Sequence, residues 1–249
     1  GSVLITPEEL RPLRARADRA IAARGYETTF EVRNETTLAA AHRLVARLGP
    51  ERVAALNFAS ARNPGGGFLN GSQAQEESLA RASALHACLE RQPAFYEANR
   101  RGRSLLYTDH MIVAPRVVVF RDDHDRLLEE PWEVTLVTAP APNAGAIAKN
   151  EPASSRQIEP AFRRRIEGVL SATVAFNQSA LVLGAWGCGV FGNEPATVAR
   201  LFGDFLLGDG PFARAFAHVT FAVLDRHGEI IAPFTEVFGG HGASQPAPK

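Results

Sequence analysis

The sequence has few cysteines, no net charge and no long apolar run, and each absence excludes a class of protein. Its 249 residues include two cysteines, Cys88 and Cys188, which lie far apart and show no metal-ligand spacing. This pattern excludes a disulfide-stapled scaffold and suits a reducing compartment, where thiols stay free. No run approaches the roughly 18 apolar residues that a membrane span requires. With 27 basic and 27 acidic residues, the chain lacks the basic face of a duplex-DNA binder, so neutral backbone donors must hold any polyanion.

The first residues also lack the apolar segment of a secretory signal. They read VLITPEELRPLRARADRAIAARG, which is the pattern of a charged amphipathic helix. We therefore expect a cytoplasmic protein that makes no contact with a membrane.

Apolar residues recur at helical spacing in some segments and run continuously in others, which predicts alternating helices and strands. The predicted helices cover residues 7–24, 36–48, 73–91, 156–177 and 195–207. The predicted strands cover residues 52–59, 111–122, 132–145, 179–186 and 218–225. This alternation predicts an α/β fold in which a mixed sheet lies between two layers of helices. Ligands bind such sheets at the carboxyl ends of the strands, so we expect the two glycine-rich loops to share one rim.

The first glycine loop, NPGGGFLNGSQAQEE at residues 63–77, carries three glycines ahead of two adjacent glutamates, Glu76 and Glu77. Glycine lets backbone N–H groups approach a ligand closely. A carboxylate beside that ligand can serve as general acid and then general base in glycosidic cleavage. This pattern indicates a catalytic site.

The same segment also has a purely structural interpretation. Ser72 and Gln75 match a capping box, in which the Gln75 side chain bonds back to the start of a helix. Glu77 and Arg81 match an ion pair at i,i+4 on a helix surface. Both interpretations stay open on these residues alone.

The second glycine loop, GCGVFG at residues 187–192, matches the G-x-G-x-x-G pattern of dinucleotide-binding folds. Its glycines, Gly189 among them, are expected to adopt positive φ and to let N–H groups hold a phosphate. A Rossmann oxidoreductase would need an acidic residue about 20 positions further on, whereas Asp225 lies 33 positions past Gly192. A tight connection without a ligand is the other alternative. Phe191 argues against it, because an aromatic ring between glycines suits stacking on a base or ribose, worth about 1–3 kcal/mol.

The first loop, with its spacing and its Gln-Glu-Glu triplet, resembles the signature of the poly(ADP-ribose) glycohydrolases, most closely the bacterial-type branch. GAWGCGVFGN resembles the diphosphate-binding loop of that family, and TAPAPNAG resembles it more loosely. The resemblance implies a macrodomain-like core over residues 51–240 and an N-terminal helical extension packed on it over 3–50. Residues 241–249 have too little apolar content to order themselves, so we expect a disordered tail there. It also implies hydrolysis of ribose–ribose O-glycosidic bonds without a metal or a cofactor.

The resemblance assigns roles by position. Glu77 would be the catalytic acid and base, and Glu76 would bind a ribose hydroxyl, with Gln75 supporting the cluster. Phe191 would pack against the terminal ribose. The implied ligand-binding positions of the two glycine loops are Gly65, Gly66, Gly67, Gly187, Cys188, Gly189, Val190, Phe191 and Gly192. The adenine pocket stays unassigned, and its candidates are Asn57, Asn143 and Phe234.

The implied substrate is poly(ADP-ribose) or an ADP-ribosylated protein, and the implied product is ADP-ribose. The main alternative is a macrodomain that binds ADP-ribose without cleaving it. That alternative would leave the Gln-Glu-Glu triplet without a function.

Overall fold

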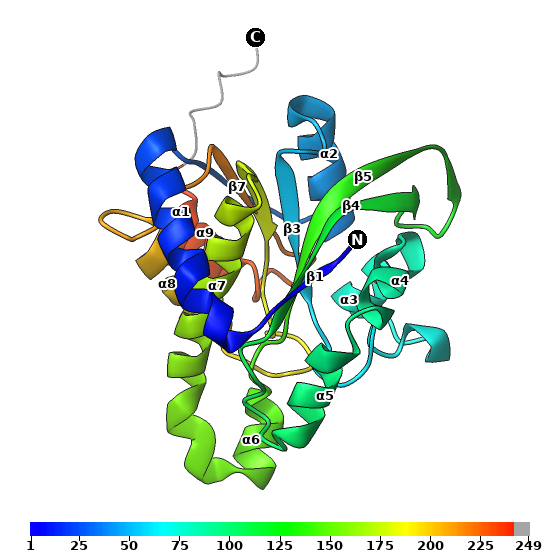
Figure 1. Cartoon of the computed structure of the whole chain (residues 1–249), viewed down its shortest axis with the longest axis vertical. Coiled ribbons are helices and arrows are strands. Elements are labelled where there is room, and N and C mark those ends of the chain that lie inside the picture. Colours follow the sequence, from blue (N-terminus) through cyan, green and yellow to red (C-terminus); the bar gives the residue numbers. More distant parts are fainter. Residues whose placement is uncertain (242–249) are drawn as a thin grey trace.

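The computed structural model describes residues 1–241, which form a seven-stranded mixed sheet between two layers of helices (Figure 1). The strand order is β1-β4-β5-β3-β6-β7-β2. The strands are β1 (Val3–Ile5), β2 (Thr29–Arg33), β3 (Val53–Phe58), β4 (Met111–Arg121), β5 (Leu127–Ala139), β6 (Ala180–Leu183) and β7 (His218–Ala222). β4 is antiparallel to both of its neighbours, and the pairs from β5 to β2 are parallel. The expected α/β class and mixed sheet are confirmed; of the expected disordered tail, residues 242–249 lie outside the described residues.

Nine α-helices flank the sheet within these residues. They are α1 (Leu10–Arg24), α2 (Thr37–Leu48), α3 (Gln75–Ala82), α4 (Leu85–Glu90), α5 (Pro93–Arg101), α6 (Ala144–Asn150), α7 (Ile158–Ala175), α8 (Pro195–Leu206) and α9 (Ala232–Phe238). α1, α7, α8 and α9 share one apolar cluster with the sheet, and α2 to α5 share the other. β3 supplies both clusters, since Ala54 and Leu56 face the first layer and Val53 and Ala55 face the second. The uninterrupted apolar run of β3 follows from this burial on both faces.

Residues 3–50 contribute more than the two expected helices. They also supply both edge strands of the sheet, since β1 pairs with β4 and β2 pairs with β7. Neither strand was predicted from the sequence. β1 is only three residues long, and β2 (TFEVR) is a half-buried strand without the apolar run that marks β3. The division at residue 50 into an extension and a core stays a prediction.

The single helix predicted over residues 73–91 is wrong, because the chain breaks at Ser83 into α3 and α4. Ser83 is extended and forms an isolated bridge with Val119 of β4. Its hydroxyl donates to the Leu79 carbonyl (2.6 Å) and accepts from the Leu85 N–H (3.2 Å), which replaces helical bonds. Helical periodicity cannot reveal such a bridge, since the partner lies on a distant strand.

The two glycine loops leave neighbouring parallel strands at the same rim, as expected. The first follows β3 and the second follows β6, and Ala54 pairs with Leu181 between those strands. The ring of Phe58 lies so close to Gly184 that a Cβ added there would be 3.0 Å from it. The loops therefore begin side by side.

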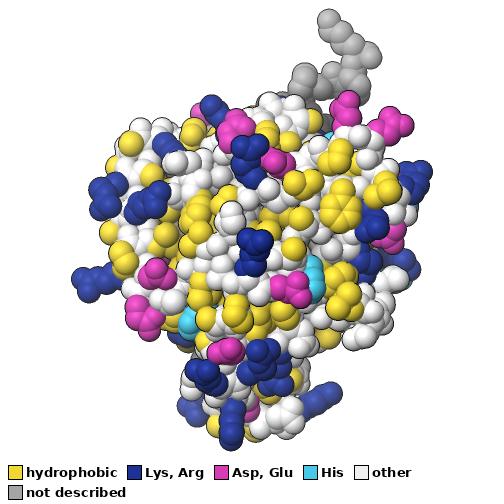
Figure 2. Space-filling view, turned by 45° about the vertical axis from the view of Figure 1, so that its right-hand side comes forward, with side chains coloured by type: hydrophobic (Ala, Val, Ile, Leu, Met, Phe, Trp, Pro, Cys, Tyr) yellow, Lys and Arg dark blue, Asp and Glu magenta, His cyan; other side chains and the backbone are white. Residues whose placement is uncertain are grey.

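The surface carries both signs of charge. On the face shown in Figure 2, basic and acidic side chains are interspersed with apolar ones, except that basic side chains gather at its lower end. This mixture accords with the zero net charge of the sequence. No helix between residues 1 and 241 has the length and apolar character needed to cross a bilayer.

Candidate active site

Glu76, in the first turn of α3, points its carboxylate into the protein. It is 2 % exposed, and its Oε1 accepts a hydrogen bond from Nδ2 of Asn57 (3.1 Å) while its Oε2 accepts one from the N–H of Ser60 (2.6 Å). Burial raises the pKa of Glu76 to about 8, and the charge of Glu77 adds to the rise, although the two hydrogen bonds oppose it. At neutral pH Glu76 is therefore mostly protonated, so the adjacent glutamates do not carry two full charges.

Glu77 is half-buried and lies against the triple glycine. Its Oε1 accepts from the N–H of Gly67 (3.0 Å), and its Oε2 accepts from the N–H of Ala74 (3.1 Å). Gly65 and Gly66 have φ of +68° and +63°, and a Cβ on Gly66 would collide with Oε1 of Glu77. Only glycine combines this φ with this approach. The glycines thus let the backbone fold directly onto the Glu77 carboxylate.

The structural interpretation of this segment is wrong in both particulars. The helix is capped at Ala74, not Ser72, and Glu77 bonds back to the cap in the place expected for Gln75. Arg81 donates to the Ser72 carbonyl (2.7 Å) and forms no ion pair with Glu77. Both glutamates are thus turned toward the loop and strand that precede the helix.

Gln75 fastens α3 to the end of β3. Its Oε1 accepts from the N–H of Phe58 (2.8 Å), and its Nε2 donates to the Leu56 carbonyl (2.7 Å) and to Oγ1 of Thr37 (3.1 Å). Both polar groups of the side chain are therefore used inside the protein. Gln75 acts by fixing where the helix begins, and thereby where the two glutamates point.

The second glycine loop presents open backbone donors. Four of its N–H groups have no acceptor among residues 1–241, namely those of Gly187, Gly189, Val190 and Phe191. Side-chain amide bonds from Asn193 to the carbonyls of Pro142 (2.8 Å) and Gly187 (3.0 Å) brace the loop. A row of open N–H groups on a braced glycine loop can hold an anion such as a diphosphate.

The expected positive φ is found at only two positions of this loop, Gly187 (+75°) and Gly192 (+64°). The expectation for Gly189 is wrong, because its φ is ordinary and an added Cβ would meet nothing within 4 Å. Burial raises the pKa of Cys188 to about 12, so its thiol is not a nucleophile at neutral pH.

The three candidates for the adenine pocket have other roles in the structure. Asn57 is fully buried, and its Nδ2 also donates to Oγ1 of Thr138 (3.2 Å). The side chain of Asn143 caps α6 by accepting from the N–H of Ala146 (3.0 Å). Phe234 is fully buried in the core of the α9 side. None of the three lines the cleft of about 510 Å³ described below.

The sequence indicates only a polar connection over residues 92–110, but the structure has α5 there, followed by a segment whose Tyr107 packs against Phe191 of the second glycine loop. The ring of Tyr107 lies 6.0 Å from that of Phe191, centroid to centroid, and Tyr107 has φ of +60°. Arg165, fully buried, holds this conformation by donating to the carbonyls of Leu106 and Tyr107 (2.9 Å for Tyr107) and pairing with Asp109 (3.0 Å). Nothing in the local sequence signals this contact, because it depends on a helix more than 50 residues away.

A cleft of about 510 Å³ extends from the first turn of α3 across the ends of β6 and β7. Its lining includes Thr36 at the start of α2, Ser78 of α3, Gly189 of the second loop and Leu224 after β7. Glu76 and Glu77 are not part of this lining, although their neighbours Ala74 and Gln75 are. One end of the cleft therefore adjoins the helical turn that carries the glutamates.

Comparisons with known proteins agree with this geometry. Residues 4–122 match the family model for the catalytic domain of microbial-type PARG. The structure is similar to that of the poly(ADP-ribose) glycohydrolase of Deinococcus radiodurans in complex with ADP-ribose, with 48% identity, 96% of this chain and 95% of that chain covered, and a TM-score of 0.90. It is also similar to the Thermomonospora curvata glycohydrolase bound to the inhibitor ADP-HPD, with 49% identity, coverages of 95% and 84%, and a TM-score of 0.86. No curated protein sequence matches the chain.

The chain belongs to the microbial-type poly(ADP-ribose) glycohydrolase family. Membership confirms the family resemblance, the macrodomain-like fold and the glycosidase class. It also excludes a Rossmann oxidoreductase. Asp225, the acidic residue considered for a Rossmann site, braces its own loop. Its carboxylate accepts hydrogen bonds from the N–H groups of Ile230 (2.6 Å) and Ile231 (3.0 Å).

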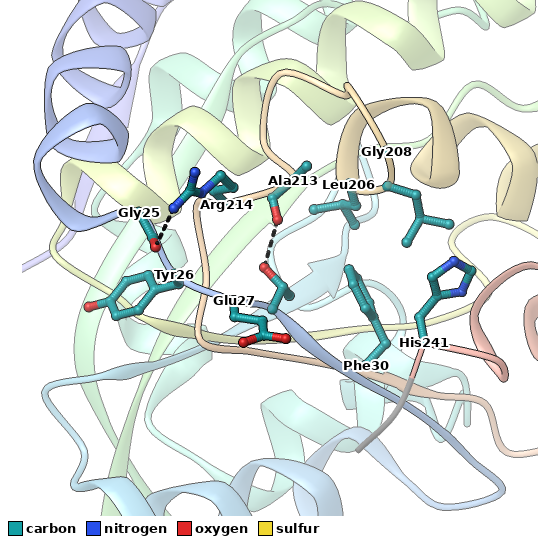
Figure 3. A pocket seen from close by; sticks show the side chains of 11 residues that line it. Gly25, Tyr26, Glu27, Phe30, Leu206, Gly208, Ala213, Arg214 and His241 are labelled. Atoms are coloured by element: carbon teal, nitrogen blue, oxygen red, sulfur yellow. Dashed lines mark hydrogen bonds between the residues drawn. The ribbon is translucent and has the colours of Figure 1, made fainter. Parts of the chain in front are cut away.

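The glycohydrolase has a second hollow, of about 630 Å³, at the opposite end of the sheet (Figure 3). It lies at the amino ends of β2 and β7, where Arg214 donates to the Gly25 carbonyl (3.1 Å) and Thr28 donates to the Ala213 carbonyl (2.8 Å). Glu27 is the single carboxylate in its described lining. Because this hollow has neither a glycine-rich loop nor a pair of adjacent carboxylates among residues 1–241, it lacks the groups that suggest phosphate binding and acid–base catalysis at the rim.

Proposed function

We propose that the protein hydrolyses the ribose–ribose O-glycosidic bonds of poly(ADP-ribose), with Glu77 as general acid and general base. The observation that carries this proposal is the contrast between two adjacent glutamates on one helical turn. Glu76 is buried and mostly neutral, whereas Glu77 is half-buried and faces the glycine loop. A pair of carboxyl groups in different environments can divide the roles of ligand and acid/base.

In the proposed mechanism, protonated Glu77 gives its proton to the leaving ribose oxygen as the glycosidic bond breaks. An oxocarbenium-like centre then develops on the terminal ribose. The Glu77 carboxylate next takes a proton from the attacking water, whose oxygen forms the new bond to the ribose. This step restores the acid, so one glutamate serves both halves of the reaction. Glu76 would bind a hydroxyl of the same ribose, for which its buried carboxyl group would have to turn away from Asn57 or Ser60.

The rest of the substrate would follow the rim. The open N–H groups of the second loop would bind the diphosphate, and Phe191 would pack against the terminal ribose beside Tyr107. The cleft beyond Gly189 would receive the adenosine. The Deinococcus relative is in complex with ADP-ribose, which supports ADP-ribose as the ligand. The product would be ADP-ribose, and the substrates would be poly(ADP-ribose) and ADP-ribosylated proteins, with no role for duplex DNA.

We also propose a cytoplasmic location, since both cysteines are free in the structure. Free thiols suit a reducing compartment.

Incubation with automodified poly(ADP-ribose), with release of ADP-ribose as the readout, tests the proposed activity directly. A macrodomain that only binds would show affinity for ADP-ribose and release nothing. That result would overturn the glycohydrolase in favour of the binding module.

Hydrogen exchange tests whether the two glycine loops form one site. ADP-ribose should protect both loops and the start of α3, and at 100 times its Kd it should stabilise the fold by about 2.7 kcal/mol. NAD carries an additional nicotinamide on the terminal ribose, which the proposed enclosure by Glu76, the triple glycine and Phe191 would exclude. Stronger protection by NAD than by ADP-ribose would contradict this placement of the terminal ribose.

A further inference from the structure

Five basic side chains lie on the loop after β3, on α5 and α6, and on the segments that directly follow these two helices. This set, which we call the basic edge, consists of Arg62, Arg100, Arg103, Lys149 and Arg156. All five residues are exposed, and none takes part in an ion pair among residues 1–241. α5 and α6 lie at the lower end of the molecule (Figure 1), where Figure 2 shows basic side chains gathered. A chain with no net charge thus has a local positive excess here.

Arg62 and Arg100 of the basic edge lie at the loop after β3, which carries Ser60, a hydrogen-bond partner of Glu76. Arg62 lies two residues after Ser60, whose N–H binds the Glu76 carboxylate. The guanidinium of Arg100 donates to the Arg62 carbonyl (2.7 Å), which joins α5 to this loop. These contacts place both arginines beside the glutamates, outside the cleft of about 510 Å³.

Arg103 of the basic edge lies on a segment whose backbone is held in place by hydrogen bonds. Arg103 has φ of +52°, and the residues after it are tied down by Glu151, which accepts from the hydroxyl of Ser104 (3.1 Å) and the N–H of Leu105 (3.0 Å). The Leu105 carbonyl accepts from the N–H of Asn143 at the start of α6 (3.0 Å). Glu151 is therefore engaged with its neighbours and forms no ion pair with the basic edge.

The direction of the polymer follows from the position of the cleft. The cleft runs from the first turn of α3 across the ends of β6 and β7, and along α3 to Asp122, Asp123 and Asp125 at the β4–β5 turn. In the proposed function this cleft holds the terminal ADP-ribose unit and the scissile bond lies at Glu77. The remaining chain would then leave on the side of Glu77 away from the cleft, toward α5. Each further unit brings a charged diphosphate, and arginine binds phosphate through paired, charge-assisted hydrogen bonds.

We propose that the basic edge binds the diphosphate of the ADP-ribose unit beyond the scissile bond, which makes it a subsite for the polymer and not for the terminal unit. This inference rests on the proposed function. It predicts that the enzyme favours polymeric substrate over ligands that contain a single ADP-ribose unit. It also predicts a salt-dependent KM, because phosphate contacts release counterions from a polyanion.

The test compares two triple variants that remove the same number of charges. One carries Arg62→Gln, Arg100→Gln and Arg103→Gln. The matched control carries Arg11→Gln, Arg16→Gln and Arg19→Gln, three exposed arginines of α1 on the far side of the molecule. Melting temperatures confirm folding. The measurements are KM for poly(ADP-ribose) at several salt concentrations and the Kd of ADP-ribose by calorimetry.

The basic-edge variant should raise KM for the polymer roughly 10-fold and keep the Kd of ADP-ribose. The salt dependence of KM should weaken by a log–log slope of about 0.7 for each phosphate that the variant no longer binds. An unchanged KM, an equal rise in the α1 control, or a loss of ADP-ribose affinity would each overturn the subsite. If the unaltered protein released no ADP-ribose from polymer, the proposed function itself would fail. If the wild-type protein released ADP-ribose and both triple variants kept its KM for the polymer, only the subsite would be overturned and the proposed function would stand. Should the triple variant unfold, Arg103→Gln alone decides by the same measurements, with Arg16→Gln as its control.

Discussion

Gly66 lies so close to Glu77 that no side chain fits between them. A Cβ at Gly66 would collide with Oε1 of Glu77, and the neighbouring Gly67 N–H binds that same oxygen. The backbone of the glycine loop therefore fixes the position of the Glu77 carboxylate, so a shift of the loop would also move the carboxylate.

This relationship predicts that Gly66→Ala lowers kcat far more than Gly71→Ala. Both glycines have positive φ, +63° and +83°, so alanine at either should cost about 1–2 kcal/mol of stability. Only the alanine at Gly66 also displaces Glu77, since a Cβ at Gly71 meets nothing within 4 Å. We expect a roughly 10²-fold loss of kcat for Gly66→Ala and a small loss for Gly71→Ala. Steady-state kinetics on poly(ADP-ribose) measure kcat for both variants. Equal losses of kcat would contradict the inference that the glycine loop positions Glu77.

Glu77→Gln should abolish turnover and leave ADP-ribose binding intact. Glutamine keeps the shape of the side chain and one acceptor oxygen, but it cannot donate and retrieve the proton. Loss of a positioned acid/base costs about 10²–10⁴-fold. Rates of ADP-ribose release and calorimetry with ADP-ribose are the measurements, and Glu130→Gln, an exposed glutamate of β5, is the control. Near-normal cleavage by Glu77→Gln would remove its assignment as the acid/base.

The raised pKa of Glu76 predicts how stability changes with pH. Because its pKa is about 8 in the folded protein and near 4.5 in the unfolded chain, the folded state holds more protons between these values. The contribution of Glu76 to the free energy of unfolding should be greatest below pH 4.5. It should fall as pH rises toward 8, by at most about 1.4 kcal/mol per pH unit.

Glu76→Gln removes this titration. Urea unfolding at pH 5, 7 and 9 should therefore show that the wild-type protein loses stability relative to the variant as pH increases. The comparison cancels the other titrating groups, which both proteins share. A constant difference between the two proteins over this range would contradict the raised pKa.

Gly189→Val offers a test of binding with little effect on folding. Its φ is ordinary and an added Cβ meets nothing, but Gly189 lines the cleft. Valine should thus preserve the melting temperature and weaken ADP-ribose binding by about 10-fold or more, because its methyl groups occupy ligand space. Gly240→Val is the matched control, since that glycine is equally open and lies outside the cleft. Unchanged affinity in a folded Gly189→Val protein would count against a phosphate site at this loop.

The sequence was sufficient to predict five of the seven strands, the shared rim and the close approach of the triple glycine to a glutamate, because each leaves a local signal. The apolar run of β3 marks a strand covered on both faces, and the triple glycine before Glu76 and Glu77 marks a close backbone approach. The capping of α3 was mispredicted because Ser72 satisfies the local pattern while Glu77 provides the cap. The choice between them depends on tertiary contacts such as those of Gln75 with β3.

Other parts of the site could not be predicted, because their causes lie far away in the chain. Tyr107 adopts its left-handed conformation because the buried guanidinium of Arg165 donates hydrogen bonds to the carbonyls of Leu106 and Tyr107. Asn143, a candidate for adenine binding, serves as a helix cap. Residue type alone cannot distinguish a polar side chain that binds a ligand from one that binds its own backbone.

The placement of the two edge strands has a consequence for how the protein folds. Among residues 1–241, β2 pairs with one strand, β7, and Thr29 is paired with His218, which lies 189 positions further on. A growing polypeptide must therefore extend past β7 before β2 can join the sheet. Contacts of such high sequence separation slow folding, because a long loop must close before they form. Until then the edge of β7 stays unpaired and open to another chain, so the last step of sheet assembly is also the step at which aggregation competes most strongly.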